Sequence, residues 1–330
     1  KYVLKANKYY VLGRPYLDEI QLAFFSKESD LAKALETGAV ESAYGIPQEG
    51  VLSAPYARVF GVFFNSSNNP VFARAEVRKA LSLAVNREGI VENVLGGYAT
   101  AIMGPVPPGS GIKETVALHT EDPVTHAADT LRDAGWVYDG DARAWKHAAA
   151  KLSFDSLTIK TSNVSELKAV GSAIKSDWEK LGIFVDIELY EPGDLNQNVI
   201  RPRKYDALLF GMVIGREADL YAFWHSAERN DPGLNIALYA NKDVDALLQE
   251  ARQESNPDKR LTHLQKIEDI VAGDFPAAFT HAPDFVYAVP KYLGGVTLPQ
   301  ITTPSDRFAT IATWYLGTDA VWPFLVPKQH

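Results

Sequence analysis

The chain of 330 residues contains no cysteine. Disulfide bonds, thiolate metal sites and cysteine nucleophiles are therefore excluded. A basic run of five or more residues is also absent, and 41 acidic against 33 basic residues give a net charge of −8. This acidic excess argues against nucleic acid or an anionic membrane as a partner, because both are bound through basic patches. The longest apolar runs fall far below the ~18 residues that a membrane span requires.

The motifs of common catalytic and cofactor sites are missing as well. The chain has no G-x-S-x-G, no P-loop, no H-E-x-x-H and no G-x-G-x-x-G. Its seven histidines are scattered, and no two stand four residues apart, the spacing that turns two imidazoles toward one metal on a helix. Acidic pairs such as Asp139 and Asp141 fall where a turn or a helix start accounts for them. The residues therefore predict no catalytic site, no metal site and no cofactor.

What is present is an alternation of strand and helix patterns, clearest over residues 152–211. Phe154, Leu157 and Ile159 indicate a strand, and alternating apolar residues over 183–189 indicate another. Between them lies a helix pattern with apolar residues spaced by 3, 4, 4 and 3: Leu167, Val170, Ile174, Trp178 and Leu181. A strand, a helix and a second strand at this spacing predict a crossover between parallel strands. The fold class is therefore α/β, in two lobes.

Local signals mark where several elements begin and end. Asn86 predicts a break in the helical pattern of residues 76–97, and Asp139-Gly140 predicts the turn of a hairpin. Asn256 before Pro257 predicts an N-cap followed by proline at the first helical position. Asn163 with Glu166 predicts a capping box.

Aromatic residues are abundant, with 6 Trp, 15 Tyr and 15 Phe. Many fall in predicted loops or near strand ends, where aromatic side chains commonly line ligand clefts. Packing in the core is the alternative for any one of them. The densest mixture of rings and charges is "GREADLYAFWHSAERNDPGLN", residues 215–235, directly after the predicted strand "YDALLFG".

Five collinear segments resemble family 5 of the extracellular solute-binding proteins, the peptide, nickel and oligosaccharide receptors of ABC importers. They are "NKYYVLGRPYLDEIQL", "LAKALETGAVESAYGIP", "VFFNSSNNPVFARAEVRKALSLAVNREGIVENVLGGYATAIMGPVPPG", "AADTLRDAGW" and "NIALYANKDVDALLQEAR". Two positions depart from the family pattern. Arg74 or Ala75 stands in place of the aspartate of D-x-x-V-R, and Asn86 in place of the aspartate of D-R.

The resemblance implies a two-lobed fold like that of the type II periplasmic binding proteins. Residues 59–285 would form a complete second lobe, and 1–58 with 286–330 would be the hinge and a remnant of the first. Family members are longer, and the chain begins at Lys1 without methionine or a signal sequence. We therefore expect a first lobe that lies mostly before Lys1, in a chain that is processed, truncated or naturally reduced.

The resemblance also implies a function, which is to capture peptides by closure of the lobes, without enzymatic activity. Oligosaccharides, opines and metal chelates are the alternative ligands, and a hydrolase that uses paired carboxylates is the alternative class. The expected partners are a small solute and the ABC permease subunits, for a monomeric protein outside the cytoplasm. The full-length precursor would be periplasmic or extracellular, with a lipid anchor as one option.

In peptide-binding relatives, an aspartate after the strand equivalent to "YDALLFG" pairs with the ammonium group of the peptide. Here Gly215 or Arg216 stands at that position. Either Glu217 or Asp219 takes over this role, or Arg216 grips an anionic group of the ligand, or Arg216 pairs with an acid and faces solvent. The expected ligand contacts are Arg216, Glu217, Asp219, Tyr221 and Trp224. His225 is expected to be a hydrogen-bonded structural residue.

Overall fold

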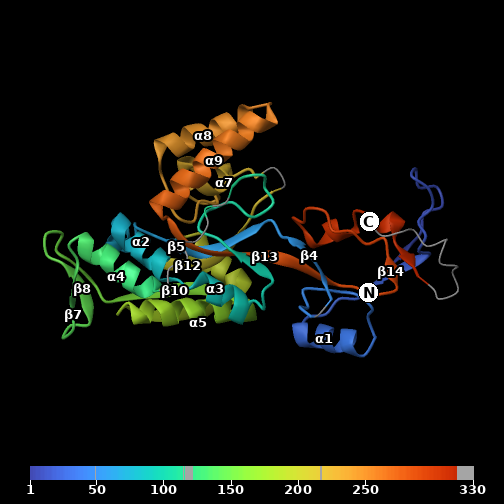
Figure 1. The fold of residues 1–330 in the computed structure, drawn as a ribbon, viewed down its shortest axis with the longest axis horizontal. Helices are drawn as coiled ribbons and strands as arrows, with labels where there is room; N and C mark the ends of the chain where they lie inside the picture. Colours follow the sequence, from blue (N-terminus) through green and yellow to red (C-terminus); the bar gives the residue numbers. More distant parts are fainter. Residues whose placement is uncertain (49, 114, 116–121, 216–217, 318–330) are drawn as a thin grey trace. The chain divides into compact units, whose positions relative to one another are not determined.

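A computed structural model describes residues 1–48, 50–113, 115, 122–215 and 218–317 (Figure 1). Contacts within the chain divide it into two units. The larger unit is formed by residues 57–283, and the smaller by residues 1–56 with the chain from 284 onward. Among the described residues, no helix combines the length and the apolarity of a bilayer span.

A sheet with strand order β11-β10-β12-β5-β13 forms the centre of the larger unit. Strand β10 runs parallel to both β11 and β12, which confirms the predicted crossover between parallel strands. Strand β5 is antiparallel to its two neighbours, and β6 pairs with β13 at residues 281–283. The strands are β5 (Arg58–Phe64), β6 (Ala99–Ala101), β10 (Ser156–Ser162), β11 (Phe184–Tyr190), β12 (Ala207–Val213) and β13 (Ala277–Ala288).

Helices cover both faces of this sheet, because successive side chains of a strand point to opposite sides. On β12, Ala207 and Leu209 belong to one apolar core, and Leu208 belongs to the other. In Figure 1, α5 lies below the sheet while α8 and α9 lie above it. The first core includes residues of α2 (Ala75–Ala84), α4 (Pro123–Asp133) and α5 (Ser165–Lys180). The second includes residues of α7 (Tyr221–Trp224), α8 (Lys242–Gln253), α9 (Pro257–Asp274) and a π-helical turn (Leu195–Ile200) after α6 (Pro192–Asp194).

Two of the predicted helix signals are confirmed. Helix α2 ends at Ala84, and the side chain of Asn86 accepts a hydrogen bond from the Gly89 amide to start α3 (Arg87–Gly89) and a π-helical turn (Ile90–Val94). The side chain of Asn256 likewise caps α9. Both asparagines act within three residues of their own position, so the sequence alone carries the signal.

The capping box predicted at Asn163 is wrong. Helix α5 starts at Ser165 after Val164, without a side-chain cap. The Asn163 amide donates to the Tyr190 carbonyl, at 2.9 Å, which continues the pairing of β10 with β11 by one residue. The Asn163 side chain donates to the Glu191 carboxylate instead. Pairing between the strands thus holds Asn163 one residue before the position that could cap the helix.

A second, three-stranded antiparallel sheet completes the larger unit. The Asp139 carboxylate accepts hydrogen bonds from the amides of Asp141 and Ala142, which forms the predicted hairpin turn. The single strand predicted through Phe154 and Ile159 is wrong, because these two residues lie in strands of different sheets. The strands of the second sheet are β7 (Val137–Asp139), β8 (Ala144–His147) and β9 (Leu152–Phe154).

The smaller unit has short strands and one α-helix among its described residues. The ring of Tyr44 stacks on Phe285 with centroids 4.7 Å apart, within a core that includes Tyr287, Ile301 and Trp314. The last residues of β13 pair with β3 (Ala43–Tyr44) and β4 (Leu52–Pro55). The other elements are β1 (Tyr2–Lys5), β2 (Glu19–Leu22), α1 (Glu28–Glu36), β14 (Leu293–Gly294) and β15 (Tyr315–Leu316).

Candidate functional site

The segment after β12 is held by buried residues on both sides of Asp219. Directly after the strand, the Ile214 amide donates to the Ala57 carbonyl at 2.8 Å. The Ala218 amide then donates to the Gly215 carbonyl at 2.9 Å, and Ala218 has a positive φ of 49°. Ala218 and Leu220 are both buried in the second core. Asp219 lies between these two anchors, with its side chain at the surface.

The carboxylate of Asp219 is paired with Arg252 at the end of α8. Arg252 donates from Nε at 3.0 Å to both carboxylate oxygens and from Nη2 at 2.6 Å to Oδ2. The Tyr221 amide donates to Oδ1 at 3.1 Å. Partial burial by itself would raise the pKa of Asp219, but these hydrogen bonds hold the pKa below its ordinary value. Asp219 is therefore an ionised group whose charge is balanced within the unit.

Tyr221 lies between a cation and an imidazole. The Arg252 guanidinium is 3.9 Å from the centroid of the Tyr221 ring, and the His225 ring stacks on Tyr221 with centroids 4.2 Å apart. A cation over an aromatic face is attracted by the ring quadrupole, so Asp219 and Tyr221 fix Arg252 together. The tyrosine is half-buried as a result.

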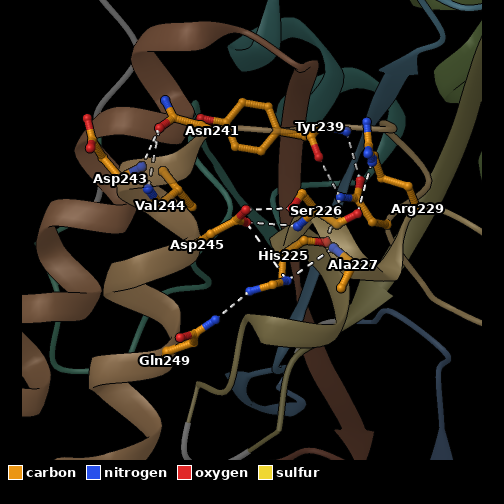
Figure 2. A network of polar contacts seen from close by, with 11 residues as sticks. His225, Ser226, Ala227, Arg229, Tyr239, Asn241, Asp243, Val244, Asp245 and Gln249 are labelled. Atoms are coloured by element: carbon orange, nitrogen blue, oxygen red, sulfur yellow. Dashed lines mark hydrogen bonds and ion pairs between the residues drawn. The ribbon is translucent and has the colours of Figure 1, made fainter.

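His225 belongs to a hydrogen-bonded network, as the sequence predicts. Figure 2 shows its imidazole between α8 and the turn that follows α7. Nδ1 accepts a hydrogen bond from the Ala227 amide at 3.1 Å, and the Gln249 side-chain amide lies 3.1 Å from Nε2. Asp245 accepts hydrogen bonds from the amide and the hydroxyl of Ser226, at 2.8 and 2.5 Å. These contacts fasten the turn to α8.

Asn235 is a key residue of this segment that sequence reasoning missed. It is fully buried, and its side chain donates to the carbonyls of His225 and Tyr239, at 3.1 and 2.9 Å. It also accepts a hydrogen bond from the Tyr239 amide at 3.0 Å. One side chain thus holds together two points of the chain 14 residues apart. Asn235 is the first residue of the motif "NIALYAN". The sequence therefore marked it as part of the family pattern but did not indicate its structural role.

Trp224 lies in the second core and exposes 0% of its surface. Its ring centroid is 5.8 Å from those of Phe279 and Tyr239. Among the described residues, its buried indole Nε1 has no hydrogen-bond partner. In this conformation Trp224 packs the unit, because α7 turns it toward the sheet. A contact between Trp224 and a ligand stays a prediction.

The five predicted ligand contacts therefore divide into three groups. Asp219 and Tyr221 are brought together at the surface by Arg252. Trp224 points into the core. Arg216 and Glu217 lie outside the described residues. Within the described ranges, no three His, Asp or Glu side chains gather as a metal site requires.

A shallow depression of about 650 Å³ lies elsewhere on the larger unit, and its described lining does not include Asp219, Tyr221 or Trp224. It is polar and wide open, and two of its lining residues, Arg201 and Asp231, form an ion pair of 2.9 Å. Ligand sites are usually concave and mostly apolar, so this depression is a poor candidate. It is lined by Gln197, Asn198, Arg201, Pro202 and Asp231.

Comparison with known proteins gives a family match over most of the chain. The family model "Bacterial extracellular solute-binding proteins, family 5 Middle" matches residues 1–231. The oligopeptide-binding protein AppA of Bacillus subtilis is 25% identical over 328 residues, which cover 95% of this chain and 59% of AppA. The probable D,D-dipeptide-binding periplasmic protein DdpA of Escherichia coli is 23% identical, over 89% of this chain and 56% of DdpA. The chain thus spans somewhat more than half the length of these relatives.

Solved structures share the fold. The structure of AppA from Bacillus subtilis in complex with a nonapeptide has a TM-score of 0.74 at 24% identity, and the match covers 96% of this chain and 64% of AppA. NikZ from Campylobacter jejuni in complex with Ni(L-His) has a TM-score of 0.70 at 21% identity, over 94% and 64% of the two chains. These likenesses confirm the predicted fold class, that of the type II periplasmic binding proteins.

Proposed function

Because the chain belongs to family 5 of the bacterial extracellular solute-binding proteins, we propose that it is the substrate-binding part of an ABC importer. The observation that carries the proposal is the family match over residues 1–231, together with relatives that match 95% and 89% of this chain. Binding would occur by closure of two lobes, without covalent chemistry. The family consists of solute-binding proteins, and for this chain we propose the same, with no enzymatic activity.

Peptides are the ligand class that we propose. The names of three relatives support it, since AppA, DdpA and GsiB are described as binding oligopeptides, D,D-dipeptides and glutathione. A metal chelate is the second candidate, because NikZ, which has the same fold, was solved with nickel and histidine. The two classes differ in their anchoring group, since a peptide offers an ammonium and a carboxylate and a chelate presents a metal complex.

The larger unit would supply one wall of the binding cleft, and the smaller unit would belong to the hinge and the first lobe. We propose that the segment after β12 faces the ligand and that Arg216, Glu217, Asp219, Tyr221 and Trp224 contribute to it. The pairing of Asp219 with Arg252 supports a polar contact whose two charges are already balanced. Such a pair favours a ligand group that accepts and donates hydrogen bonds over one with an unpaired charge.

The full-length protein would act outside the cytoplasm, periplasmic or extracellular, with ABC permease subunits as its partners. The relatives are described as extracellular in the family name and as periplasmic in the case of DdpA. A lipid anchor on the precursor and a monomeric state are further parts of the proposal.

Calorimetry on the full-length protein tests the ligand class. It would be titrated with a peptide, with the same peptide acetylated at its amino group, and with a nickel–histidine complex. Saturable binding of a peptide supports the proposal, and binding of the nickel complex alone supports the second candidate. Binding of neither, or mass-spectrometric detection of peptide cleavage, contradicts it. The 330-residue chain by itself should bind weakly or not at all, since it would lack most of one wall.

A further inference from the structure

Helix α9 carries a buried carboxylate that no part of the proposed binding wall uses. Glu268 exposes 0% of its surface and lies on the apolar side of the helix, one turn after Leu264. None of the described side chains forms an ion pair with it. A buried carboxylate without a cation is costly to ionise, so its position requires an explanation.

The Glu268 carboxylate holds Val106 and Thr115, two described residues of the loop between β6 and α4. Oε2 accepts a hydrogen bond from the Val106 amide and Oε1 from the Thr115 amide, both at 3.1 Å. The carboxylate lies so close to Gly104 that a Cβ added there would be 1.7 Å from Oε1. This loop residue therefore has to be glycine for the contact to form.

A second side chain of α9 binds the same loop one turn earlier. The Gln265 side chain accepts a hydrogen bond from the Lys113 amide at 2.8 Å and donates to the Lys113 carbonyl at 2.9 Å. Gln265 is exposed and neutral, whereas Glu268 is buried and titratable. Of these two side chains, only Glu268 can itself take up a proton.

We propose that Glu268 and the amides of Val106 and Thr115 form a proton-responsive latch that fastens the described part of this loop, residues 103–113 and 115, to helix α9. Closing the loop on α9 removes the carboxylate from water, and opening the loop returns water to it. The ionised form therefore favours the open loop, and the protonated form favours the closed loop. The latch holds more strongly in acid and loosens as the pH rises.

The charged groups around Glu268 do not reverse this direction. Asp269 follows it on α9 and has the same sign, so it disfavours ionisation further. The guanidinium of Arg87, on α3, is bound to the carbonyls of Ile102 and Phe279 and to the Ser82 hydroxyl. Three further titratable groups on these elements pair elsewhere or lie at the surface: His263 with Glu250 of α8, His281 of β13 with Glu166 of α5, and Lys113 of the loop.

Burial raises the pKa of Glu268 to about 7, although the hydrogen bonds from Thr115 and Val106 act in the opposite direction. If the open loop restores the ordinary pKa of 4.5, closing of the loop takes up one proton at a pH between 4.5 and about 7. The closed loop should then lose about tenfold in relative population between pH 6 and pH 8. Above pH 8 the loss continues only slightly, since both states are ionised.

Nuclear magnetic resonance on the 330-residue chain tests the latch. The amide shifts of Val106 and Thr115 should titrate together with a midpoint of about 7. Their protection against hydrogen exchange, corrected for the intrinsic rate, should fall about tenfold from pH 6 to pH 8. In Glu268→Gln both effects should vanish, because the amide side chain does not titrate. A midpoint near 4.5, protection that rises with pH, or titration that persists in Glu268→Gln would overturn the proposal.

Asp269→Asn provides a second variant, which keeps every contact of Glu268 with the loop. Removing this neighbouring negative charge should lower the common midpoint of Val106 and Thr115 and leave their titration intact. The variant keeps the test decisive even if Glu268→Gln does not fold. A midpoint that rises, or that does not move, would contradict Glu268 as the titrating group.

Discussion

The guanidinium of Arg252 binds both carboxylate oxygens of Asp219 and covers the ring of Tyr221. Two residues that the sequence offers as separate ligand contacts are thus fixed by a third, from a helix that begins 21 residues after Tyr221. The acid of the proposed binding wall is consequently paired before any ligand arrives. Its ability to bind an ammonium group depends on whether Arg252 releases it.

Replacing Arg252 by alanine should therefore change ligand preference more than stability. The pair is exposed, with about 45% of each side chain accessible, so its loss should lower the free energy of unfolding by less than ~1 kcal/mol. The freed Asp219 should bind an amine, and the ratio of affinities for free and acetylated peptide should rise several-fold. Calorimetry on the full-length protein measures this ratio.

Arg252→Lys is the matched control, because lysine keeps the charge but not the two-pronged geometry. We expect a smaller change in the affinity ratio than for alanine. An unchanged ratio in both variants would show that Asp219 does not face the ligand.

Asn235 should be among the most sensitive polar residues of the larger unit. Asn235→Ala leaves two carbonyls and one amide without their partner in a buried position, which should cost about 2–3 kcal/mol in urea unfolding. Asn235→Asp should cost more, because a carboxylate cannot donate to the carbonyls of His225 and Tyr239. If aspartate is tolerated better than alanine, the assigned donor roles are wrong.

Signals that act over a few residues could be predicted from the sequence. The caps at Asn86 and Asn256 and the turn at Asp139 depend on hydrogen bonds to amides two or three positions away, and all three are confirmed. Asn163 failed because an interaction between strands, invisible in the local pattern, competes with the cap. Local chemistry was therefore reliable where no distant strand competed for the same residue.

The candidate site was harder to predict for a similar reason. Trp224 lies on a helix of four residues, too short for periodicity to indicate which side faces the core. Glu268 continues the apolar stripe of α9, four residues after Leu264, which is a visible signal. Its partners Val106 and Thr115 come from a loop more than 150 residues earlier, so only the fold identifies them.

The stability of the chain should depend on pH through Glu268. Its pKa is raised by burial to about 7 in the folded chain, from an ordinary value of 4.5. A raised carboxyl pKa contributes stability that is present below about 4.5 and is lost as the pH rises to about 7. Over this range the unfolding free energy of the wild type should therefore fall relative to that of Glu268→Gln, by at most roughly 3 kcal/mol.

Urea unfolding of both proteins at several pH values measures this difference. Asp269→Asn should reduce the shift, because it removes a charge that helps to raise the pKa of Glu268. A difference that stays constant between pH 4.5 and pH 7 would contradict a buried, titrating Glu268.

Two buried tryptophans allow the role of the Trp224 indole to be measured directly. Trp178 and Trp224 each expose 0% of their surface, but Trp178 donates from Nε1 to the Leu81 carbonyl at 2.8 Å. The Trp224 Nε1 has no partner among the described residues. Replacement by phenylalanine removes the N–H and part of the ring in both cases, so the loss of packing is similar. Trp178→Phe should therefore cost about 1 kcal/mol more than Trp224→Phe in urea unfolding, since only it breaks a hydrogen bond.

The same pair of variants distinguishes a packing role of Trp224 from a binding role. If Trp224 only packs the core, Trp224→Phe should leave the peptide affinity of the full-length protein within about twofold of the wild type, as Trp178→Phe should. If the unpaired N–H of Trp224 binds ligand, peptide affinity should fall in Trp224→Phe and not in Trp178→Phe. The unfolding free energy of Trp224→Phe should still be higher than that of Trp178→Phe. Equal losses of stability in the two variants would instead show that Nε1 of Trp224 has a partner within the folded chain.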